Sequence, residues 1–282
     1  MERQDTYIFD LNSPAELARL INQDRFLTQA MGGPLAGLPD LPAQAKVLDV
    51  ACGPGGWALD VALDRPDLEV AGIDRSEPMI SYATARAQAQ GRKNATFGVM
   101  DITQPLDFSD ATFDLINARL LLGVLKREAW DALLDECTRI LRPGGILRLI
   151  EPDDSGSTNS KTFEYLSSLA IKSLWNGGYG FSLNGRSFGL GPALLHKLKQ
   201  RGYQATVSSF VGDYSHDSPG WADFYHNAEI TTPQLRIPLI KAGELTEEEF
   251  DQLYQQELIE MWSEDFTALW HFVVILGIAP TR

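Results

Sequence analysis

Short apolar segments recur through the first half of this chain, with helical stretches between them. VLDV, EVAGI, ATFGVM, FDLI and ILRLI begin at residues 47, 69, 95, 113 and 146. Short strands that alternate with helices are typical of βαβ units, which build a parallel sheet covered by helices on both faces. The alternation therefore predicts an α/β fold with a Rossmann-like, doubly wound sheet.

A glycine-rich loop follows the first predicted strand. The run Gly53-Pro54-Gly55-Gly56-Trp57-Ala58 satisfies the dinucleotide-binding pattern G-x-G-x-x-G/A. Glycines in such a loop allow a sharp turn from strand to helix and a close approach of the backbone to a ligand. The pattern alone does not separate NAD from other adenosine ligands, and a structural turn without any ligand also satisfies it.

Asp49 separates these ligands, because it lies inside the strand that leads into the loop. A carboxylate at this place repels a pyrophosphate and attracts a cation. S-adenosylmethionine is the adenosine cofactor that carries a sulfonium and an ammonium group in place of phosphates. Asp49 therefore favours S-adenosylmethionine and leaves an NAD-dependent oxidoreductase as the weaker alternative. The loop also lacks the Gly-Lys-Ser/Thr of an ordinary P-loop.

Two further predicted strands end in aspartates. Asp74 closes the second strand, where a carboxylate accepts hydrogen bonds from the ribose hydroxyls of either cofactor. Asp101 follows the third strand, between Met100 and Ile102, and is placed to accept from an adenine amino group while its neighbours sandwich the ring. Because the carboxyl ends of parallel strands converge on one crevice, the three acids predict a single ligand site.

Four motifs occur in the order and spacing of a known family. They are VLDVACGPGG, AGIDRSEPMI, VMDITQPLDFSDATFDLINAR and RILRPGGILRLIEPD, and together they cover about residues 45–152. With these motifs the sequence resembles the class I S-adenosylmethionine-dependent methyltransferases of the small-molecule type. The resemblance implies a seven-stranded, mostly parallel sheet with an antiparallel last strand, completed by the segments near 205 and 270, together with helical cap elements.

The resemblance also implies a set of cofactor contacts. They are Asp49, Cys52, Gly53, Pro54 and Gly55 near the methionine part, Asp74, Arg75 and Met79 beside the adenosine, Met100, Asp101 and Ile102 around the adenine, and Asn117 and Ala118 at the floor. Many relatives begin with a Tyr before a capped helix with Arg and Gln, so Tyr7, Arg25 and Gln29 are expected to cover the cofactor, with surface or helix-packing roles as the alternative. Cys52 is expected to be a small side chain in a tight turn and not a nucleophile.

The predicted elements divide the chain into six parts. In order they are an N-terminal helical lid segment (1–45), the cofactor-binding Rossmann-like core (46–152), a cap or lid insertion (153–190), a core helix with the sixth strand (191–211), a helical insertion over the acceptor site (212–264) and the last strand of the core (265–282). The insertions lie outside the core pattern, so we expect them to build the acceptor pocket.

Methyl transfer from a sulfonium is an in-line displacement in which positioning is the main task and a general base is optional. The candidates for such a base are His216 and His226 in the helical insertion and Glu151 at the end of the fifth strand. Each has a structural alternative. His226 lies among aromatic residues in WADFYHN and is typical of a packed or surface histidine, and Glu151 is placed to cap the strand end.

The predicted acceptor is a small organic molecule. Aromatic residues are frequent in the insertions and suit the hydroxyl of an aromatic or apolar metabolite, although N- or C-methylation stays open and such residues also form ordinary core. The members of this aromatic set are Trp175, Tyr179, Phe181, Phe188, Trp221, Phe224 and Tyr225. A protein that binds S-adenosylmethionine without transferring its methyl group is the alternative from another functional class.

The charge balance restricts the partners. A formal net charge of −14 argues against nucleic acid, which normally meets a basic face. No apolar segment is long enough to span a bilayer, and Cys52 and Cys137 have no metal-ligand spacing, so we expect a cytoplasmic monomer or homodimer without a metal. The acidic run from Glu244 to Asp265 is interpreted as the solvated face of a helix capped by Thr246, with a partner surface as the alternative.

Overall fold

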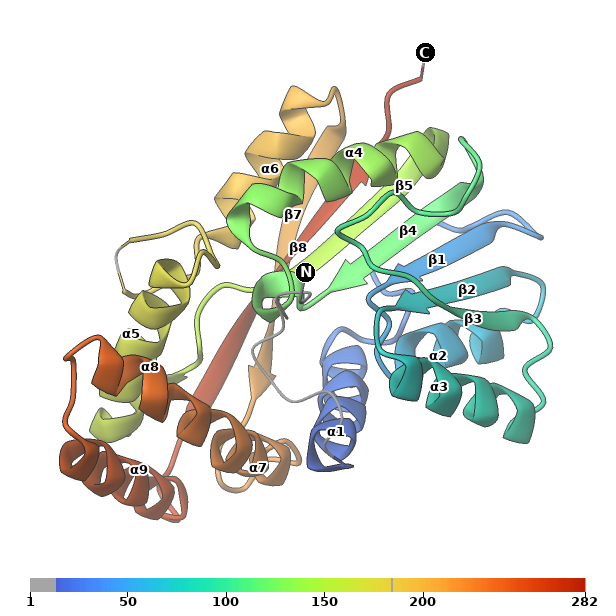
Figure 1. The fold of residues 1–282 in the computed structure, drawn as a ribbon. Helices are drawn as coiled ribbons and strands as arrows, with labels where there is room; N and C mark the ends of the chain where they lie inside the picture. Colours follow the sequence, from blue (N-terminus) through green and yellow to red (C-terminus); the bar gives the residue numbers. More distant parts are fainter. Residues whose placement is uncertain (1–13, 184, 282) are drawn as a thin grey trace.

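The computed structural model describes residues 14–183 and 185–281, and a mixed sheet runs through its centre (Figure 1). The sheet has eight strands in the order β3-β2-β1-β4-β5-β8-β6, and β7 pairs with β8 along its other edge. The strands are β1 Lys46–Val50, β2 Glu69–Asp74, β3 Ala95–Val99, β4 Phe113–Arg119, β5 Leu141–Pro152, β6 Ser157–Thr158, β7 Gln204–Asp213 and β8 Ala268–Ile278.

The pairing confirms the predicted fold class. Strands β1 to β5 are mutually parallel, and β8 runs antiparallel to both β5 and β7. The sheet has one strand more than the seven that the resemblance implies. The additional strand is the two-residue β6, which pairs with Ala268 and Leu269 at the start of β8. The polar residues of the segment 153–162 left this bridge without a strand pattern in the sequence.

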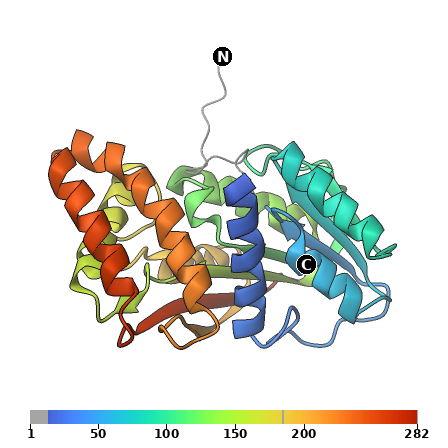
Figure 2. The same cartoon turned by 90° about the horizontal axis from the view of Figure 1, so that it is seen from below.

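Helices cover both faces of the sheet (Figures 1 and 2). Apolar residues of α4 and α6 pack on one face with Leu48 and Val50, and those of α2 pack on the other with Val47. This alternation along β1 is the period of two that a strand buried on both faces requires. The core helices are α2 Gly56–Asp64, α3 Glu77–Ala89, α4 Trp130–Ile140 and α6 Leu190–Gln200.

The remaining helices form a separate lobe beside the start of β8, which we call the cap. The cap consists of α5 Lys161–Asn176, α7 Trp221–Thr231, the 3₁₀ turn η3 Thr232–Leu235, α8 Arg236–Lys241 and α9 Glu247–Met261. Helix α1, Pro14–Ala30, stands between the cap and the core, in contact with α2 on one side and α7 on the other (Figure 2). The cleft between the cap and the sheet therefore has α1 as its third wall.

Local capping agrees with the sequence at two helix starts. The Ser76 hydroxyl accepts a hydrogen bond from the Met79 amide at the start of α3. At the start of α9, Thr246 and Glu249 form the reciprocal capping box. Both arrangements satisfy amide groups that the first turn of a helix leaves without partners.

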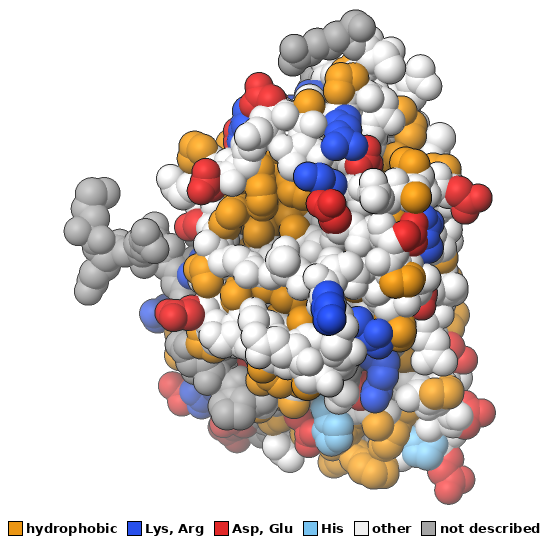
Figure 3. Space-filling view, turned by 90° about the vertical axis from the view of Figure 1, so that its right-hand side faces the viewer, with side chains coloured by type: hydrophobic (Ala, Val, Ile, Leu, Met, Phe, Trp, Pro, Cys, Tyr) orange, Lys and Arg blue, Asp and Glu red, His pale blue; other side chains and the backbone are white. Residues whose placement is uncertain are grey.

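The surface carries charges of both signs. On the face drawn in Figure 3, acidic and basic side chains are interspersed, and apolar side chains are exposed between them. Among the helices of the described residues, none is both long and apolar enough to cross a membrane.

Candidate functional site

A cavity of about 560 Å³ lies where the carboxyl ends of the core strands face α1 and the cap. One half is lined by strand ends and the glycine loop, and we call it the core half. The other, the cap half, is lined by α5, α7, η3, α8 and α9. The predicted contacts in the core-half lining are Asp49, Cys52, Gly53, Pro54, Asp74, Arg75, Met79, Met100 and Ile102.

Asp49 lies at the bottom of the core half and is 2% exposed. The Asn117 side-chain amide donates a hydrogen bond of 2.7 Å to Asp49 Oδ1, and Asn117 Oδ1 accepts from Arg148 Nε at 2.8 Å. Burial raises the pKa of Asp49 to about 6, against the opposing effects of Arg119 and the Asn117 hydrogen bond. A buried carboxylate with a raised pKa at a cavity wall is suited to a cationic ligand, which restores its ionised form.

Asp74 ties the end of β2 to the glycine loop. Its Oδ2 atom accepts from the Gly53 amide at 2.9 Å, and its Oδ1 atom accepts from the Ser76 amide at 2.8 Å. Burial raises the pKa of this carboxyl against those backbone hydrogen bonds. A carboxylate has about four acceptor sites and backbone amides do not fill all of them, so Asp74 is held in place and still able to accept from a ligand hydroxyl.

The two predicted loop glycines have different tasks. Both have positive φ, 52° at Gly53 and 76° at Gly55. A Cβ at Gly53 meets nothing within 4 Å, whereas a Cβ at Gly55 lies 2.8 Å from Ala83 Cβ and from the Phe97 ring. Gly53 therefore leaves room on the ligand side, and Gly55 lets the loop pack against α3 and β3.

The third predicted acid is placed beside the cavity and not in its wall. Met100 and Ile102 line the cavity, but Asp101 between them does not. Asp101 Oδ1 accepts from the Thr103 amide at 2.9 Å and from the Thr103 hydroxyl at 2.7 Å.

Cys52 lines the cavity from the glycine loop. Burial raises the pKa of its thiol well above the ordinary value, which favours a neutral thiol.

Helix α1 presents a different face to the cavity from the one predicted. Gln29 is exposed, and Arg25 forms an ion pair of 3.5 Å with Asp223 of α7. Tyr7 lies outside the described residues. The α1 residues that line the cavity are Arg19, Leu20, Gln23, Asp24 and Leu27. Their spacing of three, four and seven positions is one helical face, and the seven-residue spacing of Leu20 and Leu27 is the sign of that face in the sequence.

At the end of β4, Arg119 lines the cavity, next to the two residues predicted to form its floor. Asn117 and Ala118 are fully buried beneath the cavity, and the next residue of β4, Arg119, is part of its wall. Arg119 forms an ion pair with Asp24 and donates to the Thr28 hydroxyl at 3.2 Å. The Asp24 carboxylate also packs against Gly56, the first residue of α2, so closely that a Cβ at Gly56 would overlap it. This contact joins α1 to the core at the ligand site.

Residues 47–145 match the family model described as "Methyltransferase domain". This part of the chain, from β1 to the first residues of β5, is therefore similar to a methyltransferase domain. The chain is 30% identical over 128 residues to demethylmenaquinone methyltransferase of Lactococcus lactis, covering 45% of this chain and 47% of that protein. It is 36% identical over 124 residues to phosphoethanolamine N-methyltransferase 1 of Triticum aestivum, covering 44% and 24% of the two chains.

The fold extends beyond the matched domain. A putative methyltransferase of Bacillus halodurans superposes with a TM-score of 0.56 at 17% identity, covering 92% of this chain and 98% of that one. The chain spans about half the length of the curated relatives it matches. The family model thus covers the core from β1 to the start of β5, and the cap stands outside the matched residues.

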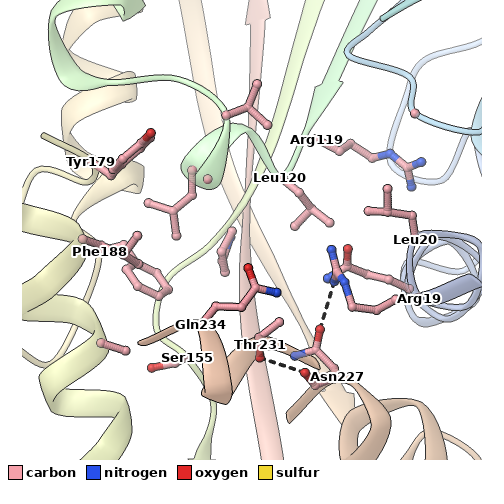
Figure 4. Close-up of a pocket in the computed structure, with 18 of the residues that line it drawn as sticks. Arg19, Leu20, Arg119, Leu120, Ser155, Tyr179, Phe188, Asn227, Thr231 and Gln234 are labelled. Carbon is pink, nitrogen blue, oxygen red and sulfur yellow. Dashed lines mark hydrogen bonds between the residues drawn. The ribbon is translucent and has the colours of Figure 1, made fainter. Parts of the chain in front are cut away.

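The cap half of the cavity is mostly apolar. Tyr179 and Phe188 face it from the segment after α5, and Asn227 and Thr231 face it from α7 (Figure 4). Of the predicted aromatic set, Tyr179, Phe188 and Phe224 line the cavity. The others pack elsewhere, with Trp175 under the Arg127 guanidinium at 3.5 Å and Trp221 and Tyr225 in a cluster with Trp262.

The three candidate bases do not line this cavity. His216 packs against the Trp221 ring, with 4.8 Å between ring centroids. The His226 side chain is 65% exposed, and its Nδ1 atom lies 2.7 Å from a Glu229 carboxylate oxygen. Glu151 accepts from the Leu121 and Leu122 amides at 2.8 and 3.1 Å, and burial raises its pKa to about 8. Its observed contacts cap the 3₁₀ turn that follows β4.

Glu257 of α9 lines the cap half and was not predicted from the sequence. It lies within the acidic run that was interpreted as a solvated face, yet it is 2% exposed. Its position seven residues after the buried Phe250 and four before the buried Met261 places it on the apolar face of α9. An acid inside an apolar stripe was the signal in the sequence.

Proposed function

We propose that this protein is an S-adenosylmethionine-dependent methyltransferase that methylates a small, largely apolar organic acceptor. The supporting observation is the single cavity that runs from the acids of the strand ends to the apolar cap. A site for group transfer must hold two molecules together with water excluded, and one continuous cavity with two chemically different halves suits that task.

The core half fits the cofactor. We assign Asp49 and the Gly53 loop to its cationic methionine part, Asp74 to the ribose hydroxyls, and Met100 with Ile102 to the two faces of the adenine. The open space at Gly53 admits a ligand against the backbone, and Asp49 has a single hydrogen-bond donor besides the charges around it. When bound, S-adenosylmethionine supplies an activated methyl carbon that an acceptor nucleophile takes by in-line displacement.

The chain's own residues supply position and environment. The Arg119–Asp24 ion pair holds α1 against the core half, and the Arg19 guanidinium donates to Asn227 at 2.9 Å, which links α1 to the cap (Figure 4). These contacts fix the third wall of the cavity. The apolar side chains of the cap exclude water from the transfer step.

The acceptor class follows from the cap half. Among the described residues of α5, α7, η3, α8 and α9 that line the cavity, none is Lys or Arg. A phosphorylated acceptor, as named for the Triticum aestivum relative, would lack a counter-charge there. We therefore propose a hydroxyl of an aromatic or apolar molecule as the methylated group.

The decisive experiment is transfer of a labelled methyl group from S-adenosylmethionine to a panel of phenols, apolar alcohols and amines. Labelled product with any member, together with a thermal shift by S-adenosylhomocysteine and none by NAD, supports the proposal. Cofactor binding without transfer to any acceptor would indicate a protein that only binds S-adenosylmethionine. A shift by NAD alone would overturn the assignment of Asp49.

A further inference from the structure

The carboxyl group of Glu257 lies in the wall of the cap half, where no Lys or Arg of the described cap helices lines the cavity. Helix α9 packs against α5, α7 and α8, and Glu257 lies on the side that faces them. The methyltransferase core does not reach this residue, since Asp49 and Asp74 belong to strands on the other side of α1 (Figures 1 and 2). Glu257 therefore belongs to the cap end of the cavity and lies on an element that carries none of the cofactor residues.

The carboxylate lacks a full set of partners. The Thr232 hydroxyl donates a hydrogen bond to it, while the Oε2 atom is buried without a hydrogen-bond partner. The neighbouring Glu260 adds negative charge and has its own partners, the hydroxyls of Ser160 and Thr162 at the start of α5. No Lys or Arg of the described cap helices lines the cavity beside Glu257, and none contributes to the shift of its pKa.

Such an arrangement is costly for the fold alone. Burial raises the pKa of Glu257 to about 7, against the Thr232 hydrogen bond. A buried polar atom without a partner destabilises a protein unless something outside the chain supplies one. Thr232, also buried, would need no carboxylate to be satisfied, because its hydroxyl can donate to a backbone carbonyl. Stability therefore gives no reason for an acid at this place.

We propose that Glu257 binds a protonated amine of the acceptor, as an anchor at the cap end of the cavity. An ammonium group supplies both the missing hydrogen-bond donor and the missing positive charge. The apolar walls of the cap half, with Leu166, Phe224 and Ala228, then receive the body of the molecule. The methylated atom lies at the other end, facing the core half. The acceptor is thus an apolar molecule with an amine at one end and a nucleophile at the other.

This inference rests on the proposed function only in naming the amine as part of the methyl acceptor. Its test is a binding measurement that needs no turnover. The protein is saturated with S-adenosylhomocysteine, and isothermal titration calorimetry compares n-alkylamines from butyl to decyl with n-alkanols of equal length. The same series is run on Glu257→Gln and on Glu264→Gln, an exposed residue beyond the end of α9 that matches the change in charge.

We expect wild type and Glu264→Gln to bind at least one amine about tenfold or more tightly than its matched alcohol. Glu257→Gln, with the same shape and no charge, loses this preference while its affinity for the alcohol changes little. An amine preference that survives in Glu257→Gln overturns the proposal, and so does a series in which no amine exceeds its alcohol. Amine binding without methyl transfer to any acceptor overturns the proposed function and leaves the anchor standing.

Discussion

The two halves of the cavity differ in how their polar groups are held. In the core half, Asp49 and Asp74 accept hydrogen bonds from neighbouring strands and from the glycine loop. In the cap half, Glu257 keeps one atom without a partner in an apolar surrounding. Groups held in fixed positions suit the proposed cofactor, which many proteins bind in the same way. An acid without a full set of partners suits the proposed acceptor, which is particular to this protein.

The glycine loop provides the sharpest test of the core half. Gly55→Ala is expected to lower the free energy of unfolding by roughly 2–5 kcal/mol, because a left-handed backbone and a Cβ clash act together. Gly53→Ala is the matched control, with the left-handed conformation but no clash, and is expected to cost about 1–2 kcal/mol. Urea unfolding of both variants checks the difference. Equal losses would mean that the loop relaxes away from Ala83 and Phe97.

These contrasts also explain what the sequence could predict. Asp49, Gly53 and Asp74 follow from the local sequence pattern, because they lie in, just after and at the end of strands that apolar residues define. Glu257 depends on which side of α9 meets α5 and α7, and that side is fixed by packing between segments far apart in the chain. The side of α1 that lines the cavity could not be predicted for the same reason, since the rotation of a helix about its axis is set by the elements that it packs against.

Glu257 should make the stability of the cap depend on pH. Its pKa rises to about 7 in the folded protein, so the folded state holds this proton more tightly than the unfolded state. The resulting stabilisation is complete below the ordinary pKa of Glu and is lost as the pH rises through 7. We expect Glu257→Gln to be more stable than wild type at pH 8.5, by on the order of 3 kcal/mol. The difference should shrink as the pH falls from 7 to 4.5.

Thermal unfolding of the two proteins across this range measures the effect, with Glu264→Gln as the variant that should follow wild type throughout. A constant difference between Glu257→Gln and wild type at all pH values would show that folding leaves the pKa of Glu257 unchanged. That result would remove the contrast between a satisfied core half and an unsatisfied cap half.

Asp49 should make cofactor affinity depend on pH in the opposite sense. A cationic ligand binds the ionised carboxylate, and without ligand the pKa of Asp49 is about 6. Affinity for S-adenosylhomocysteine is therefore expected to be full above pH 7 and about tenfold lower at pH 5. Asp49→Asn should bind about 10- to 100-fold more weakly at neutral pH and lose this dependence. Calorimetry from pH 5 to 8 checks both, and a slope retained in Asp49→Asn would assign it to another group.

The smallest effect is expected at His226, the candidate base with an exposed ring. It lies in a side cavity between α1 and α7, and Arg19 with Asn227 separates it from the larger one. We expect His226→Gln to change kcat by less than about twofold, because a general base must reach the proton it removes and typically contributes 10²–10⁴-fold. A loss of about a hundredfold at unchanged cofactor affinity would contradict this. It would show that α7 turns toward the core half during turnover, so that His226 reaches the larger cavity.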